Sequence, residues 1–190
     1  MTSYVFICNG QKIAINPNKQ PVILQMQNIW YHCHMNNKNR IMNIAPDYLP
    51  KALSLVWDVF QEFEAPEYCE EGVAEFKRYI DLDAIREKLD KDELDMWVCI
   101  NEGRVVGVIA LRPPCHISLL FVDKYYHHQG IARALFEHVL CNIKEEGTHT
   151  EMTVFSSPYA AGYYRRMGFV DTDTEQTVNG IRFIPMRRSV

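Results

Sequence analysis

The chain has 190 residues, 47% of them hydrophobic and 12% aromatic, and a formal net charge of −4. This length fits one domain with an appendage, and the apolar fraction is large enough to build a core. The negative charge argues against nucleic acid as the main partner, because that function usually needs a basic face. No apolar run approaches the roughly 20 residues of a membrane span. Six cysteines are scattered without paired spacing, so we expect a reduced, cytoplasmic protein.

The first 41 residues differ in composition from the rest of the chain. Residues 1–46 contain no Asp or Glu, whereas all 24 acidic residues lie after them. One interpretation is an accessory hairpin in which Tyr4–Cys8 and Lys12–Ile15 flank an Asn9-Gly10 turn. The other is a natural start at Met42, which would make residues 1–41 an extension, disordered or not native, ahead of a domain over 42–190. The composition favours the second interpretation.

The same segment contains His32-Cys33-His34, which invites a metal interpretation. Adjacent ligands point in divergent directions, and no second His/Cys pair stands at zinc-finger spacing. We therefore predict no metal site.

After a short strand at 41–44, apolar residues at helical spacing predict a helix from Asp47, as its N-cap, to Glu64. Pro66 would end this helix. Two further helices are predicted at Glu70–Ile80 and Leu82–Leu89.

Acidic side chains crowd these three helices. They are Glu62, Glu64, Glu67, Glu70, Glu71, Glu75, Asp81 and Asp83. They form either a solvated helical surface or a mouth that attracts a cationic amine. Trp57, Phe60 and Tyr68 either pack in the core or line a pocket there.

The middle of the chain predicts an antiparallel meander. Met96–Ile100 and Val105–Leu111 form a hairpin around a turn that contains Gly103. His116 opens the next strand, and the apolar run Ile117–Val122 is typical of an inner strand.

A polar turn that ends at Gly130 connects this strand to a helix, which Gly147 would end. The helix carries an apolar stripe that faces the sheet. Its members are Ile131, Leu135, Val139 and Ile143. Unpaired N–H groups at the start of such a helix can bind a phosphate. By itself, HHQGIA fits any strand–turn–helix crossover as well.

The last third of the chain continues with a strand at Met152–Phe155 and a helix from Pro158, capped by Ser157. Strands at Phe169–Val170 and Ile181–Met186 follow. The order of elements predicts an α/β fold with a mixed, mostly antiparallel central sheet and helices on both faces.

This order, together with LLFVDKYYHHQGIARALFEHV and SSPYAAGYYRRMGF, resembles the GCN5-related N-acetyltransferase (GNAT) family from about Met42 to Arg188. The resemblance implies an enzyme that moves an acetyl group from acetyl-CoA, its co-substrate, to a primary amine of a small molecule or peptide by direct attack. It also implies a monomer or a homodimer. The alternative is a non-catalytic acyl-CoA-binding sensor or scaffold.

The family's cofactor motif, Arg/Gln-x-x-Gly-x-Gly/Ala, falls on His127 to Ala132, where only His127 departs from it. The resemblance implies that main-chain N–H groups bind the pyrophosphate and that the preceding strand holds the pantetheine arm. The candidate cofactor-binding residues are Leu120, Phe121, Val122, His127, His128, Gln129, Gly130, Ile131, Ala132 and Arg133. Phe155 stands where many members have an Asn that contacts the cofactor.

By the same resemblance, Tyr164 is the general acid, because a phenol with a pKa of about 10 is protonated at neutral pH. Tyr163 would then face the core, since adjacent helical residues point about 100° apart. His116 is a candidate general base. It lies six residues before Val122 and should share its strand face, where Ser118 could hold a water. The alternatives are a packed histidine and a mechanism without a dedicated base.

Overall fold

The computed structural model describes residues 4–8, 11–15, 39–147 and 149–190. The chain divides into two compact units, Met1–Arg40 and Ile41–Val190. In the first unit, strands β1 (Tyr4–Cys8) and β2 (Gln11–Ile15) pair antiparallel, with Tyr4 opposite Ile15. This pairing agrees with the hairpin interpretation, while an extension over 1–41 ahead of a domain over 42–190 stays a prediction. The His32-Cys33-His34 segment lies outside the described residues.

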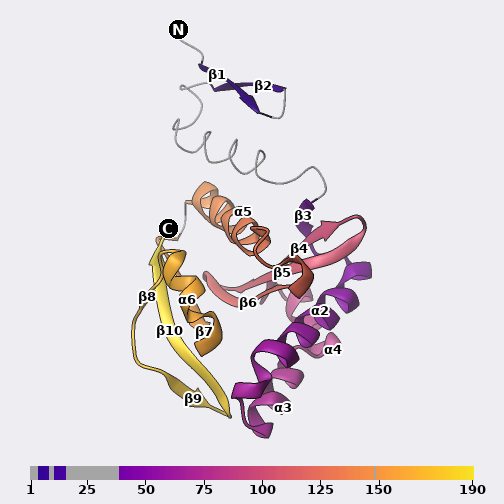
Figure 1. Ribbon diagram of the computed structural model, residues 1–190, viewed down its shortest axis with the longest axis vertical. Coiled ribbons are helices and arrows are strands. Elements are labelled where there is room, and N and C mark those ends of the chain that lie inside the picture. The colour runs from indigo at the N-terminus through magenta and orange to yellow at the C-terminus, as the bar shows by residue number, and fades with distance from the viewer. Residues whose placement is uncertain (1–3, 9–10, 16–38, 148) are drawn as a thin grey trace. The chain divides into compact units, whose positions relative to one another are not determined.

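The large sheet has the strand order β3-β4-β5-β6-β7-β10-β8, and β9 pairs with β10 (Figure 1). The bounds are β3 Asn39–Asn43, β4 Asp95–Asn101, β5 Arg104–Arg112, β6 His116–Val122, β7 Glu151–Ser156, β8 Val170–Asp171, β9 Gln176–Val178 and β10 Ile181–Ser189. Strands β4 to β6 form the predicted antiparallel meander, and β10 is antiparallel to each of its three neighbours. Strands β6 and β7 run parallel. The predicted mixed, mostly antiparallel sheet is confirmed.

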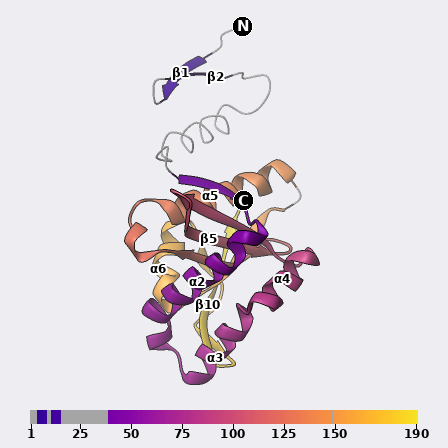
Figure 2. The ribbon, with the colours of Figure 1, turned by 90° about the vertical axis from the view of Figure 1, so that its right-hand side faces the viewer.

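Helices cover both faces of this sheet, as predicted (Figures 1 and 2). The helices are α2 Leu49–Phe63, α3 Glu70–Tyr79, α4 Leu82–Asp90, α5 Ile131–Glu146 and α6 Pro158–Arg166, with short 3₁₀ turns η1 Pro46–Tyr48, η2 Ala65–Glu67 and η3 Lys124–Tyr126. Helices α2 to α4 lie on one face, and α5 and α6 lie on the other.

The start of α2 differs from the prediction. Asp47 lies within η1, and the N-cap of α2 is Tyr48, without a side-chain hydrogen bond. An N-cap carboxylate accepts from the N–H groups two or three residues further on. For Asp47 these would belong to Leu49 and Pro50, and proline has no N–H. The prediction of Asp47 as the cap is therefore wrong.

Each helical layer packs its own hydrophobic core against the sheet. Helix α5 buries its predicted stripe completely, and α2 buries Leu53, Val56 and Phe60 on the opposite face. Burial of a large apolar side chain contributes about 1.5–3 kcal/mol. Gly130 and Gly147 bound α5 in the left-handed conformation, with φ of +80° and +65°.

A β-bulge in β6 determines where the sheet opens. Ala110 pairs with Leu119 and Leu111 with Ile117, so that Ser118 is an extra residue on β6. Bulges bend a strand and increase its twist. Strand β6 pairs with β7 over only two residues, the second of which is Ile117. The two parallel strands separate beyond that point.

The bulge also changes which side chains share a face of β6. Ile117 and Val122 belong to the core under α5, whereas Leu119 belongs to the core under α2. His116, adjacent to Ile117, therefore lies on the face opposite Val122. The prediction that His116 and Val122 share a face is wrong, because one inserted residue interrupts the alternation on which it rests.

Hydrogen bonds and close packing connect the segment after α2 to the β9–β10 hairpin. The Tyr68 hydroxyl donates to the Arg182 carbonyl oxygen at 2.9 Å, and the Arg182 guanidinium donates to the Glu67 carbonyl oxygen at 3.2 Å. Gly72 in α3 lies directly against Gly180, since a Cβ at Gly72 would lie 2.2 Å from the Gly180 carbonyl oxygen. These contacts hold α3 and the hairpin together across the chain.

We expect Gly72→Ala to destabilise the domain by about 1–3 kcal/mol, as overpacking typically does. Alanine normally stabilises a helix relative to glycine, so the reversed sign would come from the clash with Gly180. Denaturant unfolding measures the effect. Gly162→Ala in α6 is the matched control, because the nearest heavy atom to its Cβ would be Arg166 Nη1 at 3.7 Å. Equal effects of the two variants would contradict the Gly72–Gly180 packing.

Candidate active site

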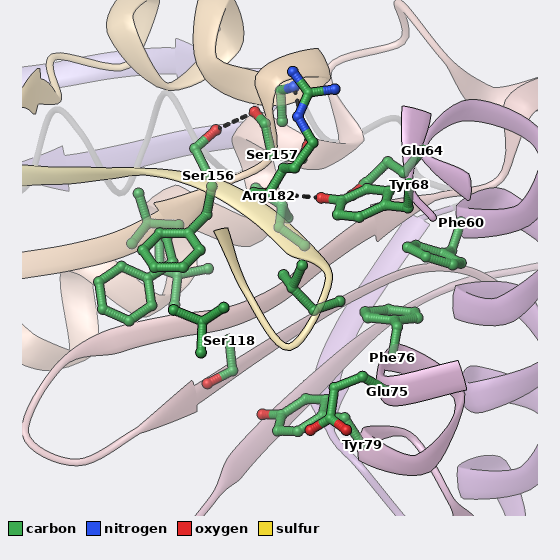
Figure 3. A pocket seen from close by; sticks show the side chains of 18 of the residues that line it. Phe60, Glu64, Tyr68, Glu75, Phe76, Tyr79, Ser118, Ser156, Ser157 and Arg182 are labelled. Carbon is green, nitrogen blue, oxygen red and sulfur yellow. Dashed lines mark hydrogen bonds between the residues drawn. The ribbon is translucent and has the colours of Figure 1, made fainter. Parts of the chain in front are cut away.

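A cavity of about 430 Å³ opens where β6 and β7 separate (Figure 3). This volume falls within the range of small-molecule sites. The cavity lies between β6, β7, helices α2, α3 and α6, and the β9–β10 hairpin. Both predicted catalytic residues, Tyr164 and His116, line it, as do Leu120 and Phe121 of β6.

One wall of the cavity is aromatic. The rings of Phe60 and Phe76 stack with centroids 3.9 Å apart, and Tyr79 lies beside the carboxylate of Glu75 (Figure 3). The Glu75 side chain is 31% exposed and also pairs with Arg78. This end of the cavity therefore combines apolar ring faces with a negative charge.

Tyr164 is buried where α6 meets the cavity. Helix α6 starts there because Ser157 caps it, as predicted: its Oγ accepts a hydrogen bond from the Ala160 N–H at 3.2 Å. Burial, with smaller contributions from Tyr163 and Glu64, raises the pKa of Tyr164 far above its usual value. The phenol therefore stays protonated at neutral pH. Tyr163 packs against the α5 core, and its hydroxyl is buried without a hydrogen-bond partner.

His116 is buried at the start of β6. Its Nδ1 lies 2.8 Å from Thr153 Oγ1, and its ring contacts Phe155 edge-on at 4.7 Å. Burial and, secondarily, the charge of Arg112 lower the pKa of His116 to about 4. The imidazole is neutral at pH 7 and binds a proton weakly.

Glu64 is a cavity residue that the sequence does not distinguish from its acidic neighbours. It is the C-cap residue of α2, half-buried, and lines the cavity. Burial raises the pKa of Glu64 to about 7, although the nearby Ser157 hydroxyl opposes the shift, and the charge of Glu67 adds to it. Its burial depends on α6 and on the β9–β10 hairpin, which come much later in the chain. No local signal could have identified it.

The start of α5 lies at the end of β6, as predicted. Gly130 is its N-cap, without a side-chain hydrogen bond, and no atom lies within 4 Å of a Cβ built there. The Ala134 N–H bonds to the Gly130 carbonyl oxygen, so the N–H groups of Ile131 and Ala132 have no partner within the helix and point beyond its end. This arrangement fits a phosphate group.

The side chains of the turn before α5 mostly hold the turn itself. His127 Nε2 lies 2.9 Å from the Val122 carbonyl oxygen, and the Gln129 amide donates to the Tyr125 carbonyl oxygen at 3.0 Å. His128 is exposed and has a φ of +59°. Arg133 pairs with Glu137 along α5 at 2.8 Å.

The strand residues divide between the cavity and the core. Leu120 and Phe121 line the cavity, whereas Val122 packs in the core under α5. Phe155, where the family often has an Asn, also lines the cavity, and its ring lies 4.6 Å from that of Phe183.

The described part of the chain contains no group of three or more His, Cys, Asp or Glu side chains that could hold a metal ion. No helix in these residue ranges is both long and apolar enough to cross a membrane.

Two features are typical of a GNAT acetyltransferase domain. The sheet opens beside a bulge in β6, and a helix with Gly130 as its N-cap begins after that strand. Residues 64–190 match the family model of the acetyltransferase (GNAT) domain. The chain belongs to the GNAT family, and the resemblance in its sequence is confirmed.

Individual proteins of the family are similar to parts of the chain. The uncharacterized N-acetyltransferase YafP of Escherichia coli (strain K12) is 38% identical over 90 residues, which are 47% of this chain and 54% of YafP. The peptidyl-lysine N-acetyltransferase YjaB of the same organism is 32% identical over 78 residues, 40% of this chain and 50% of YjaB. The chain thus spans about half the length of each relative.

A solved structure shows the same fold over a longer stretch. The PaiA N-acetyltransferase of Thermoplasma acidophilum, in complex with coenzyme A, superimposes with a TM-score of 0.69. The match covers 80% of this chain and 99% of PaiA at 16% identity, so it bears on the fold alone.

Proposed function

We propose that this protein is an N-acetyltransferase that moves the acetyl group of acetyl-CoA to a primary amine by direct attack. The observation that carries the proposal is a cavity in which a buried, protonated tyrosine meets the opened edge of β6. Family membership supports acetyl-CoA as the co-substrate. The names of YjaB and of the PaiA complex with coenzyme A agree with an amine acceptor and a coenzyme A donor.

The diphosphate of acetyl-CoA would bind at the start of α5, to the main-chain N–H groups of Gly130, Ile131 and Ala132. The pantetheine arm would follow the edge of β6 past Leu120 and Phe121, like an added strand. Separation of β6 from β7 leaves room for it there.

The side chains around the diphosphate would have supporting roles. His127 and Gln129 maintain the turn through their hydrogen bonds to backbone carbonyls, and Val122 supplies one of these carbonyls. His128 and Arg133 are exposed beside the glycine and would flank the phosphates. The departure of His127 from the family motif therefore changes the support of the turn more than the main-chain contacts.

The acceptor would be a cationic amine of a small molecule or peptide. The Glu75 carboxylate, which also pairs with Arg78, would attract its charge, and the aromatic wall of Phe76 and Tyr79 would contact its apolar part. This end of the cavity selects the charge of the acceptor, and the remaining structure of the acceptor would extend toward the β9–β10 hairpin.

Tyr164 would act as the general acid. When the C–S bond of the tetrahedral intermediate breaks, the leaving sulfur, whose thiol has a pKa of about 8.5, takes the phenolic proton. A general acid must hold its proton at that moment, and burial of Tyr164 ensures that it does.

Acetyl transfer is tested by incubating the protein with acetyl-CoA and polyamines, aminoglycosides, amino acids or lysine peptides, and following free thiol. We expect thiol release that requires a cationic amine. Binding of coenzyme A without thiol release for any acceptor would instead indicate a non-catalytic acyl-CoA sensor or scaffold.

Gly130→Ala should weaken coenzyme A binding by about tenfold or more, roughly 1.4 kcal/mol. The added Cβ would occupy the space that the phosphates need, in a left-handed conformation that alanine disfavours. Calorimetric titration measures the affinity. Gly103→Ala is the matched control, because Gly103 has the same φ of +80° and open surroundings in the β4–β5 turn. The control should lose similar stability and no affinity.

Tyr164→Phe should lower kcat on the order of 10²- to 10⁴-fold, the usual contribution of a general acid, with unchanged coenzyme A affinity. Tyr163→Phe removes the neighbouring hydroxyl, which is buried without a partner, and should leave kcat at the wild-type level. Thiol-release kinetics of the two variants check this contrast. A Tyr164→Phe protein with wild-type kcat would exclude Tyr164 as the acid.

A further inference from the structure

Glu64 lies where the cavity meets the catalytic end of α6. It ends α2 and lines the same cavity as Tyr164 and Ser157. Burial raises the pKa of both Tyr68 and Tyr164, and the charge of Glu64 adds to each shift. The charge of Glu64 therefore acts on Tyr164, the proposed general acid.

The groups packed around Glu64 keep it in an intermediate state of protonation. Glu67 repels its charge, the Ser157 hydroxyl stabilises it, and Tyr164 lies on the same cavity. The neighbouring Tyr68 donates its hydroxyl to the Arg182 backbone, and the Arg182 guanidinium pairs with Glu175. Burial outweighs these contributions and brings the pKa of Glu64 to about 7, where a general base is most efficient at neutral pH.

His116 is less suited to accept a proton. One of its ring nitrogens is occupied by Thr153, and its ring is packed against Phe155. Burial and the charge of Arg112 both disfavour the imidazolium form.

We propose that Glu64, rather than His116, is the general base for the attacking amine, an inference that rests on the proposed acetyl transfer. The cationic acceptor first releases its ammonium proton to water. As the resulting neutral amine attacks the thioester carbonyl, the C–N bond forms and one proton passes from nitrogen to the Glu64 carboxylate. When the C–S bond breaks, sulfur takes the Tyr164 proton. Protonated Glu64 then returns its proton to the Tyr164 phenolate. The products are the amide and the free thiol, and both side chains are restored.

The first test is the pH dependence of kcat/KM for wild type and Glu64→Gln with one acceptor. The ratio of the two values cancels the titration of the acceptor amine, which both proteins share. A general base works when deprotonated, so the ratio should reach on the order of 10²-fold above pH 7. It should fall toward 1 as the pH drops below about 7.

Two variants serve as controls for this ratio. Glu67→Gln removes an exposed carboxylate next to Glu64, so it should leave kcat/KM above pH 7 nearly unchanged and move the fall of the ratio to a slightly lower pH. His116→Ala should retain the decrease of kcat/KM near pH 7 that Glu64→Gln removes. A limb near pH 4 that disappears in His116→Ala would identify His116 as the base and overturn the proposal.

The second test does not depend on activity. Carbon-13 NMR of the side-chain carboxyl groups of the full chain titrates Glu64 directly, assigned by the signal missing in Glu64→Gln. We expect a midpoint near pH 7, whereas a midpoint near 4.5, the ordinary value, would overturn the proposal. Thiol release with a pH-independent ratio would overturn the role of Glu64 and leave acetyl transfer intact. No thiol release from wild type with any acceptor would overturn both.

Discussion

The cavity of this molecule opens beside one inserted residue in β6. The bulge at Ser118 bends the strand, and pairing with β7 ends after Ile117. A sheet without the bulge would continue to pair, and its backbone groups would satisfy one another. The opened edge instead leaves the strand available to an extended ligand arm, next to the start of α5. The cavity, its access to Tyr164 and the proposed path of pantetheine all depend on this separation.

The same enclosure sets the protonation states of the site. Burial favours the neutral form of every titratable group, so it raises the pKa of Glu64 and Tyr164 and lowers that of His116. The imidazole and the phenol are consequently neutral at pH 7, and Glu64 stands near the middle of its titration. A site of this kind can hold a neutral thioester while one carboxylate remains able to take up a proton.

The sequence predicts the elements whose cause is local. The stripe of α5, the glycines at its two ends and the Ser157 cap follow from spacing and residue type, and all three positions are confirmed. The bulge at Ser118 leaves no trace in an apolar run, because a strand with one inserted residue has the same composition. The state of Glu64 was equally invisible, since burial by α6 and the β9–β10 hairpin separates it from seven similar acids.

The two halves of the cavity differ in how well the sequence predicts them. The half proposed for coenzyme A comes from one continuous stretch, β6 through α5, and its main contacts are backbone groups that tolerate changes of side chain. The half proposed for the acceptor combines α2, α3 and the β9–β10 hairpin, which tertiary contacts such as Gly72 against Gly180 hold together. In the proposed reaction, substitutions in α2 and α3 would therefore change the amine that is accepted without altering how the donor binds. The donor can be inferred from a motif, whereas the acceptor depends on side chains that only the folded chain brings together.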